Sequence, residues 1–493
     1  MRIIASGFVN KVTEEVLLRL IQEFNVEFCE YYFEAKEKIV KICDTHGIDY
    51  LKIQSGNYVD DWSQITPLDE KLIDEMSYCE TVVLRMLDRN NLWLSMKYEQ
   101  RKQIYLKHLR YWNHVLIKKD INLCLFTGIP HGSFDYVIYE LCKYHNVPVL
   151  LLTSPSLIMH TVFVTDDWME PSIALKKRFE LLQKLRQQGD LPHFELSEKY
   201  QTHFTKQINH TEDPTPYYMA PKLLNSLLIK PPSLWKSLAF LLMRAAIPSK
   251  WNQWKDNLSD IMKYMSSVIE QRENSRKIRA IYYENLKPID LKCKYVYIPL
   301  QLQPECTTSP MAGAYVDQLL MVQQLAAHLP SDVLIYLKEY PVQFSYGCVS
   351  RSPEFYNQLL QIPSVRFIPE EMSTFRLIDN CVAVATATGS AGWEALFRGK
   401  PYFMFGHHVY QYAPGVHPIS SNADCEQAVS KVFDRGETPS LEDLRLFLLA
   451  FEQTATDADA VAYRIAVSPY SQESQIDRLT NAFAKAIRDK FFL

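Results

Sequence analysis

Short apolar runs alternate with helical stretches through the second half of this 493-residue chain. Segments with the length and composition of buried strands occupy residues 294–300, 332–341, 364–369, 381–387 and 401–406. Segments with helical spacing of apolar residues lie between them, at 313–329, 352–362, 372–380 and 390–399. Strict alternation of strand and helix with short connections is typical of a doubly wound parallel sheet. We therefore predict one α/β domain over residues 285–493.

The first half shows the same alternation once. A strand over 121–130, a helix over 134–146 and a strand over 147–155 form a predicted βαβ unit. We expect residues 1–280 to form a second α/β domain with helical insertions at 13–118 and 170–280. The predicted class is therefore two Rossmann-like domains.

Composition excludes several classes of protein. The formal net charge of −4 gives no reason to expect nucleic acid as a partner. Ten cysteines without a C-x-x-C pair indicate reduced thiols in a cytoplasmic protein. We expect neither a signal peptide nor a membrane-spanning helix, because no apolar stretch approaches about 20 residues.

Residues 222–255 combine six basic side chains with three tryptophans and contain no acidic residue. This pattern fits peripheral attachment to an anionic membrane surface, here the inner membrane. The alternative is a helical hairpin packed on the domain or bridging the two domains, and the sequence leaves both interpretations open.

The turn after the strand at 381–387 is the first candidate binding site. Thr388 and Gly389 connect this strand to a helix that begins near Ser390, and Glu394 lies one turn further along. Backbone N–H groups at such a turn suit a phosphate, and a carboxylate can accept hydrogen bonds from ribose hydroxyls. The alternative interpretation is an ordinary capped helix with a solvated glutamate.

Two other strand-end loops carry polar side chains to the same predicted edge. Gln303, Glu305 and Thr307 follow the strand at 294–300, and Lys338 and Tyr340 end the strand at 332–341. Polar groups that converge on one sheet edge are what a ligand site requires.

The stretches 121–155 and 294–418 resemble the bacterial capsule polysaccharide biosynthesis family, which includes Kdo transferases. The most specific motifs are QLQPECTTSP, LKEYP and TATGSAGWEALFRGKP. More distantly, the chain is similar to CDP-glycerol glycerophosphotransferases. The resemblance implies a GT-B fold with two Rossmann-like domains facing each other across a cleft. It also implies inverting transfer from a cytidine nucleotide donor to a glycan or glycolipid acceptor.

The chain departs from the family's motifs at two places. Tyr340 stands where relatives have a histidine that contacts the donor phosphate, and a phenol cannot carry its positive charge. Gly132 stands where relatives often have a glutamate, which leaves Asp135 and His131 as candidates for the general base.

We expect no metal and no cofactor other than the nucleotide-sugar substrate. The single D-x-D string, at 457–459, lies beyond the predicted donor domain, and we expect it on a solvated helix face. His407, His408 and His417 lack accompanying ligands, so we expect the loop at 406–418 to close over sugar or phosphate.

Three functions are compatible with these sequence features. The first is a metal-independent inverting glycosyltransferase of surface polysaccharide synthesis that uses a CMP-activated ulosonic acid such as Kdo. The second is a transferase that uses CDP-glycerol or a UDP- or GDP-sugar. The third is a non-catalytic homologue that binds nucleotide or glycan.

Overall fold

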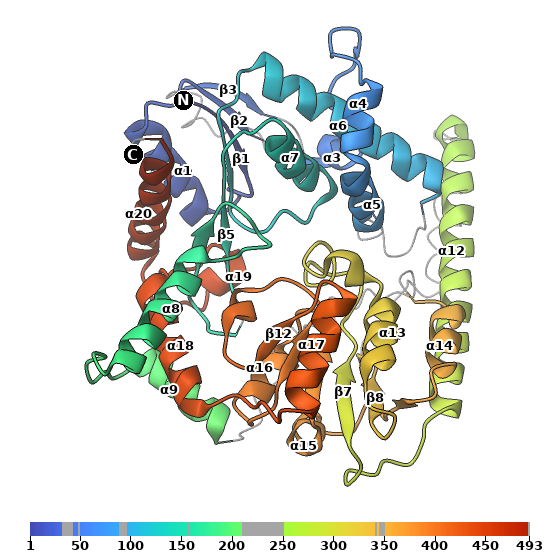
Figure 1. Ribbon diagram of the computed structural model, residues 1–493. Helices are drawn as coiled ribbons and strands as arrows, with labels where there is room; N and C mark the ends of the chain where they lie inside the picture. Colours follow the sequence, from blue (N-terminus) through green and yellow to red (C-terminus); the bar gives the residue numbers. More distant parts are fainter. Residues whose placement is uncertain are drawn as a thin grey trace.

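The computed structural model describes residues 1–31, 43–47, 50–87, 96–155, 157–209, 251–340, 343–344 and 351–491. Two six-stranded sheets organise the chain, one in each half (Figure 1). The first sheet has the order β3-β2-β1-β4-β5-β6, and the second has the order β12-β11-β10-β7-β8-β9. Every strand pair is parallel except β5 with β6. The expectation of two Rossmann-like α/β domains is confirmed.

The first sheet comprises β1 (Arg2–Ser6), β2 (Phe28–Tyr31), β3 (Asp44–Gly47), β4 (Leu123–Phe126), β5 (Val149–Thr153) and β6 (Phe163–Thr165). Its helices are α1 (Lys11–Glu23), α3 (Tyr50–Gln54), α4 (Glu70–Glu75), α5 (Ser77–Met86), α6 (Tyr98–Lys118) and α7 (Ser133–Tyr144). The range 13–118, expected as a helical insertion, thus also supplies β2 and β3.

Side chains of the first sheet alternate between two buried faces. Ile4 and Phe126 point into a core shared with α5, α6 and α7. Ile3 and Leu125 point to the opposite face, which packs on α1 and on α20 (Gln472–Phe491). Burial on both faces explains the nearly continuous apolar strands of this sheet. The C-terminal helix therefore returns to the first domain, beside α1 in Figure 1.

The second sheet comprises β7 (Tyr295–Pro299), β8 (Leu334–Lys338), β9 (Val365–Phe367), β10 (Ala383–Thr386), β11 (Tyr402–Met404) and β12 (Val416–Pro418). Its α-helices are α13 (Gln318–His328), α14 (Pro353–Leu360), α15 (Thr374–Asn380), α16 (Ser390–Leu396), α17 (Asn422–Phe433) and α18 (Leu441–Thr454). Two 3₁₀ helices, η4 (Gly313–Val316) and η6 (Val409–Tyr412), lie in its loops, and α19 (Ala462–Ile465) precedes α20.

The helices α8 (Ile173–Gln188), α9 (Glu198–Ile208) and α12 (Trp251–Glu284) connect the two sheets along the chain. Apolar side chains of α8 and α9 share a core with α16 and α18, and the end of α12 packs under β7 to β9. Much of the described part of 170–280 is thus built onto the second sheet. None of the described helices is both long and apolar enough to cross a membrane.

The region 222–255, expected as either a membrane contact or a helical hairpin, falls almost wholly outside the described residues. The backbone of α12 begins at Trp251.

Gly7, at the carboxyl end of β1, shows how closely the strand-end loops of the first domain approach each other. Its φ is +84°, and a Cβ added there would lie 2.2 Å from the Oγ1 of Thr127, which follows β4. Only glycine combines this backbone conformation with this contact.

We predict that Gly7→Ala lowers the free energy of unfolding by about 2–5 kcal/mol, the sum of left-handed backbone strain and steric overlap. Gly189→Ala is the matched control, because Gly189 has φ +78° and open space around it. The control should lose about 1–2 kcal/mol in the same urea titration. Equal losses for the two variants would contradict the close approach to Thr127.

Candidate active site

The candidate site lies where the connections of the second sheet change direction. From β7 the chain moves outward through β8 to β9, and it then returns to the other side of β7 to build β10, β11 and β12. The loops after β7 and β10 therefore start at the ends of adjacent strands and lead to opposite sides of the sheet. Ligands of open parallel sheets bind at such a switch point.

The side chain of Gln301 joins these two loops. Its Nε2 donates to Thr388 Oγ1 at 3.0 Å, and its Oε1 accepts from the Thr388 backbone N at 3.0 Å. Thr388 Oγ1 in turn donates to the carbonyl of Thr307 at 2.8 Å. Three hydrogen bonds thus fix the turn that leads into α16.

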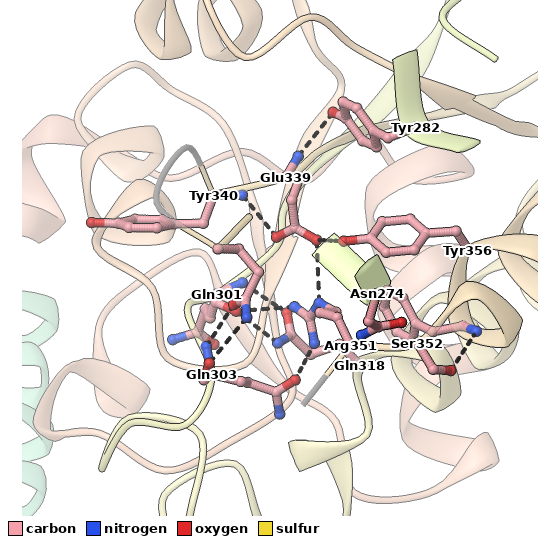
Figure 2. Close-up of polar contacts among 12 residues, drawn as sticks. Asn274, Tyr282, Gln301, Gln303, Gln318, Glu339, Tyr340, Arg351, Ser352 and Tyr356 are labelled. Atoms are coloured by element: carbon pink, nitrogen blue, oxygen red, sulfur yellow. Dashed lines mark hydrogen bonds and ion pairs between the residues drawn. The ribbon is translucent and has the colours of Figure 1, made fainter. Parts of the chain in front are cut away.

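A buried ion pair lies beneath this connection (Figure 2). Arg351 Nε contacts Glu339 Oε2 at 3.2 Å, and both side chains are at most 1% exposed. The carboxylate also accepts from the Tyr356 hydroxyl at 2.6 Å and from the Tyr340 backbone N at 2.8 Å. Because both charges are paired and hydrogen-bonded, the pair can persist without water.

The other two nitrogens of Arg351 reach the loop after β7. Nη2 donates to the Gln301 carbonyl at 3.1 Å, and Nη1 donates to Gln303 Oε1. Gln318 holds the same peptide, since its side chain accepts from the Gln301 N at 2.7 Å and donates to the Gln301 carbonyl at 3.0 Å. The loop after β7 is therefore anchored from within the protein.

Several residues expected to face a ligand instead make internal contacts. Gln303 is 4% exposed and bonds to Arg351, and Glu305 accepts from Thr307 Oγ1 at 3.0 Å. Lys338 donates to the Met372 carbonyl at 2.5 Å, and burial lowers the pKa of its ammonium. Tyr340 points its ring away from the Arg351 network in Figure 2.

The turn itself lies open at Ser390. Gly389 is the N-cap of α16, and no side chain makes a capping hydrogen bond there. The Ser390 side chain is exposed, and Glu394 is half-buried. Burial raises the pKa of Tyr410, and the nearby Glu394 carboxylate shifts it in the same direction. Glu394 therefore lies close to the buried η6 loop.

His131 and Asp135 follow the end of β4 in the first domain. His131 Nδ1 lies 2.7 Å from the Ile129 carbonyl, and the His131 backbone N donates to Asp135 Oδ2 at 3.4 Å. Interaction with Cys306 is the largest influence that raises the pKa of His131 to about 9, and Asp135 acts in the same direction. The contact with Cys306 brings the strand-end loop of the first domain against that of the second.

The loop at 406–418 also joins the two domains. The His407 ring and the Gln411 side chain reach the Met169 carbonyl at 3.1 and 3.0 Å, and the Tyr412 hydroxyl donates to Glu170 at 2.6 Å. The loop therefore connects the two domains, a role that was not expected from its histidines.

The described residues hold no group of three or more potential metal-ligating side chains. Asp457 bonds to Lys199 at 2.7 Å, and the fully buried Asp459 bonds to His160 at 2.6 Å. The solvated helix face expected for the D-x-D string is therefore wrong: these residues precede α19, and the second carboxylate lies in the interior.

A cavity of about 450 Å³ lies beside the candidate edge. Arg85 and Arg101 of the first domain line one wall, and Gln303, Asp317 and Arg351 of the second domain line others. Its volume is in the range of small-molecule sites. Its walls mix cationic and acidic groups, and neither Thr388 nor Ser390 belongs to its lining.

Sequence reasoning missed Gln301, Gln318, Glu339 and Arg351. Each is polar and adjacent to a strand end or a helix start, yet each stabilises the loops from inside. The one available signal was the placement of Gln301 and Glu339 within QLQPECTTSP and LKEYP, two of the motifs that carry the family resemblance.

The fold defines an α/β protein with two Rossmann-like domains. Residues 241–425 match the family described as "Capsule polysaccharide biosynthesis protein". This matched segment contains the second-domain motifs that carry the resemblance, and it covers less than half of the chain.

The solved structures that the chain matches include three proteins of low identity. A β-Kdo 2,7 transferase, KpsC, from Thermosulfurimonas dismutans is 12% identical, with 92% of this chain and 99% of that chain covered and a TM-score of 0.31. A UDP-GlcNAc 2-epimerase from Methanocaldococcus jannaschii is 9% identical, with 92% and 99% covered and a TM-score of 0.25. The spinosyn rhamnosyltransferase SpnG is 12% identical, with 98% and 100% covered and a TM-score of 0.24. No curated protein matches the chain.

We predict that Glu339→Gln lowers the free energy of unfolding by about 3–5 kcal/mol, because the buried Arg351 charge loses its partner. Asp332→Asn is the control, since it breaks an exposed pair with Lys294 at 2.9 Å. The control should leave the denaturation midpoint nearly unchanged. A similar small effect of Glu339→Gln would show that the buried pair is dispensable.

The His131 imidazole is predicted to stay protonated up to about pH 9, well above an unperturbed histidine. Its carbon-bound proton should titrate with that midpoint in NMR spectra, with the signal assigned through His131→Gln. Cys306→Ala should move the midpoint down, because the largest cause of the raised pKa is removed. An unchanged midpoint in that variant would exclude the contact between the domains.

Proposed function

We propose that this protein is an inverting, metal-independent glycosyltransferase of surface polysaccharide synthesis. Its donor is a CMP-activated ulosonic acid such as Kdo, and its acceptor is a glycan or glycolipid. The observation that carries the proposal is the contact of His131 with Cys306, because it sets the strand-end loops of the two domains against each other. A transfer between two bound substrates needs that juxtaposition.

The second domain supplies the proposed donor site. The turn at Thr388 to Ser390 offers backbone N–H groups and an exposed hydroxyl to the phosphate, and the Glu394 carboxylate accepts from the ribose hydroxyls. Tyr340 adds a neutral hydrogen-bond donor where relatives place a histidine. Lys338 is committed to the Met372 carbonyl and contributes to the fold of the site rather than to phosphate binding.

The first domain supplies the proposed base. The Asp135 carboxylate takes the proton of the acceptor hydroxyl as its oxygen bonds to the anomeric carbon, and the bond from that carbon to the phosphate oxygen breaks. CMP leaves with the electron pair. The pKa of His131 is raised to about 9, so this imidazole suits charge stabilisation better than proton abstraction. Together, the imidazolium and the N–H groups of the turn meet the charge that develops on the phosphate, so no step requires a metal.

We propose that the reaction takes place in the cytoplasm, at the inner membrane, with residues 222–255 as the membrane contact. Sedimentation of the full chain with vesicles containing anionic lipid tests this location. Recovery of the chain in the supernatant at low salt would contradict it.

The donor proposal is tested by thermal stabilisation with CMP, CDP, UDP and GDP, since a ligand that binds the folded state raises the melting temperature. We expect selective stabilisation by CMP, and its loss in Glu394→Ala. Asp135→Asn should keep the CMP response but lower the transfer rate by at least about 100-fold.

The other outcomes separate the alternatives. A response to CDP, UDP or GDP in place of CMP would support CDP-glycerol or another nucleotide-sugar as donor. No response to any nucleotide would support a non-catalytic role, and normal CMP binding by Glu394→Ala would contradict the proposed ribose contact.

A further inference from the structure

We infer that Gln301 is a positioning residue for the nucleotide, acting through Thr388 on the turn that the donor phosphate would contact. This inference rests on the proposed function of that turn. Gln301 is the first residue of QLQPECTTSP and lies two residues before Gln303.

The backbone of Gln301 is fixed on both sides of its peptide. The buried Gln318 side chain bonds both to its N–H and to its carbonyl, and the buried Arg351 donates to the same carbonyl. Arg351 is held in turn by Glu339 (Figure 2). A side chain that extends from such a rigid point has a fixed direction.

Because its direction is fixed, the Gln301 amide can hydrogen-bond to both the backbone N–H and the hydroxyl of Thr388. Its carbonyl oxygen accepts from the Thr388 N–H, and its amino group donates to Oγ1, both at 3.0 Å. Thr388 Oγ1 accepts from this amino group and donates its single proton to the Thr307 carbonyl at 2.8 Å. Thr388 offers one donor, its N–H, and one acceptor, its Oγ1, to residue 301. Only an amide side chain at position 301 supplies the matching acceptor and donor.

Thr388 cannot move without moving the residues that follow it. It is 4% exposed, and Gly389 and the exposed Ser390 come directly after it. The Tyr410 hydroxyl also donates to the Thr388 carbonyl at 2.5 Å. The amide of Gln301 therefore sets where the N–H groups of the turn and the Ser390 hydroxyl point.

Gln301→Glu tests the hydrogen bonds from Gln301 to Thr388 with little change in the shape of the side chain. The carboxylate still accepts from the Thr388 N–H, but it cannot donate to Oγ1, so the Thr388 hydroxyl must turn away from the Thr307 carbonyl. We expect the Kd for CMP, measured by calorimetry on the full chain, to rise about 5- to 30-fold. Gln324→Glu is the matched control, because Gln324 accepts from Tyr315 outside this network.

A pair of substitutions at Thr388 supplies the second arm. Thr388→Val removes the hydroxyl and should weaken CMP binding more than Thr388→Ser, which keeps it. The double variant of Gln301→Glu with Thr388→Val should be no weaker than the poorer single variant, since both remove the same contact. Additive losses would overturn the inference.

Hydrogen exchange of the peptide spanning 386–396 distinguishes failure of this inference from failure of the proposed function. Gln301→Glu should speed exchange there even without nucleotide, and Gln324→Glu should not. If the original chain binds no nucleotide, the proposed function fails. Faster exchange would then support the control of the turn by Gln301, and unchanged exchange would overturn it. Unchanged CMP affinity in a fully folded Gln301→Glu also overturns the inference.

Discussion

The ion pair between Arg351 and Glu339 is the interaction on which the candidate site depends. It brings two opposite charges into the core under the second sheet and leaves each with further hydrogen bonds. Such a pair adds little net stability compared with apolar residues, but it tolerates very few arrangements of its neighbours. Here those neighbours are the loops after β7 and β8, so the pair fixes the edge of the sheet that faces the first domain.

Rigidity inside the second domain is matched by polar contacts between the domains. His131 meets Cys306, and the loop at 406–412 bonds to Met169 and Glu170. The C-terminal segment also returns to the first domain, where α20 packs on α1. Apolar packing adds to these contacts, since Ile158 and Phe163 share a buried core with Trp393 and Phe447. Polar and apolar contacts together therefore hold the two domains against each other.

The fold was largely predictable, because both sheets follow from apolar runs that alternate with helical spacing. The strands β2 and β3 were not, since they are four residues each and β3, Asp44–Gly47, has almost no apolar pattern. The site was predictable to the level of loops. At the level of single residues, sequence could not tell Gln303, which faces Arg351, from Gln301, which faces Thr388, because both are glutamines in one loop. The burial of Asp459 was not predicted, because it depends on segments that are distant in sequence, such as the one that carries His160.

The central claim is that a cytidine nucleotide binds where β7 and β10 diverge. A crystal structure of the protein with CMP tests it most directly. The phosphate should lie at the turn of Thr388 to Ser390, and the ribose hydroxyls should lie at Glu394. Density for CMP in the cavity lined by Arg85 and Arg101, with the turn left empty, would contradict it.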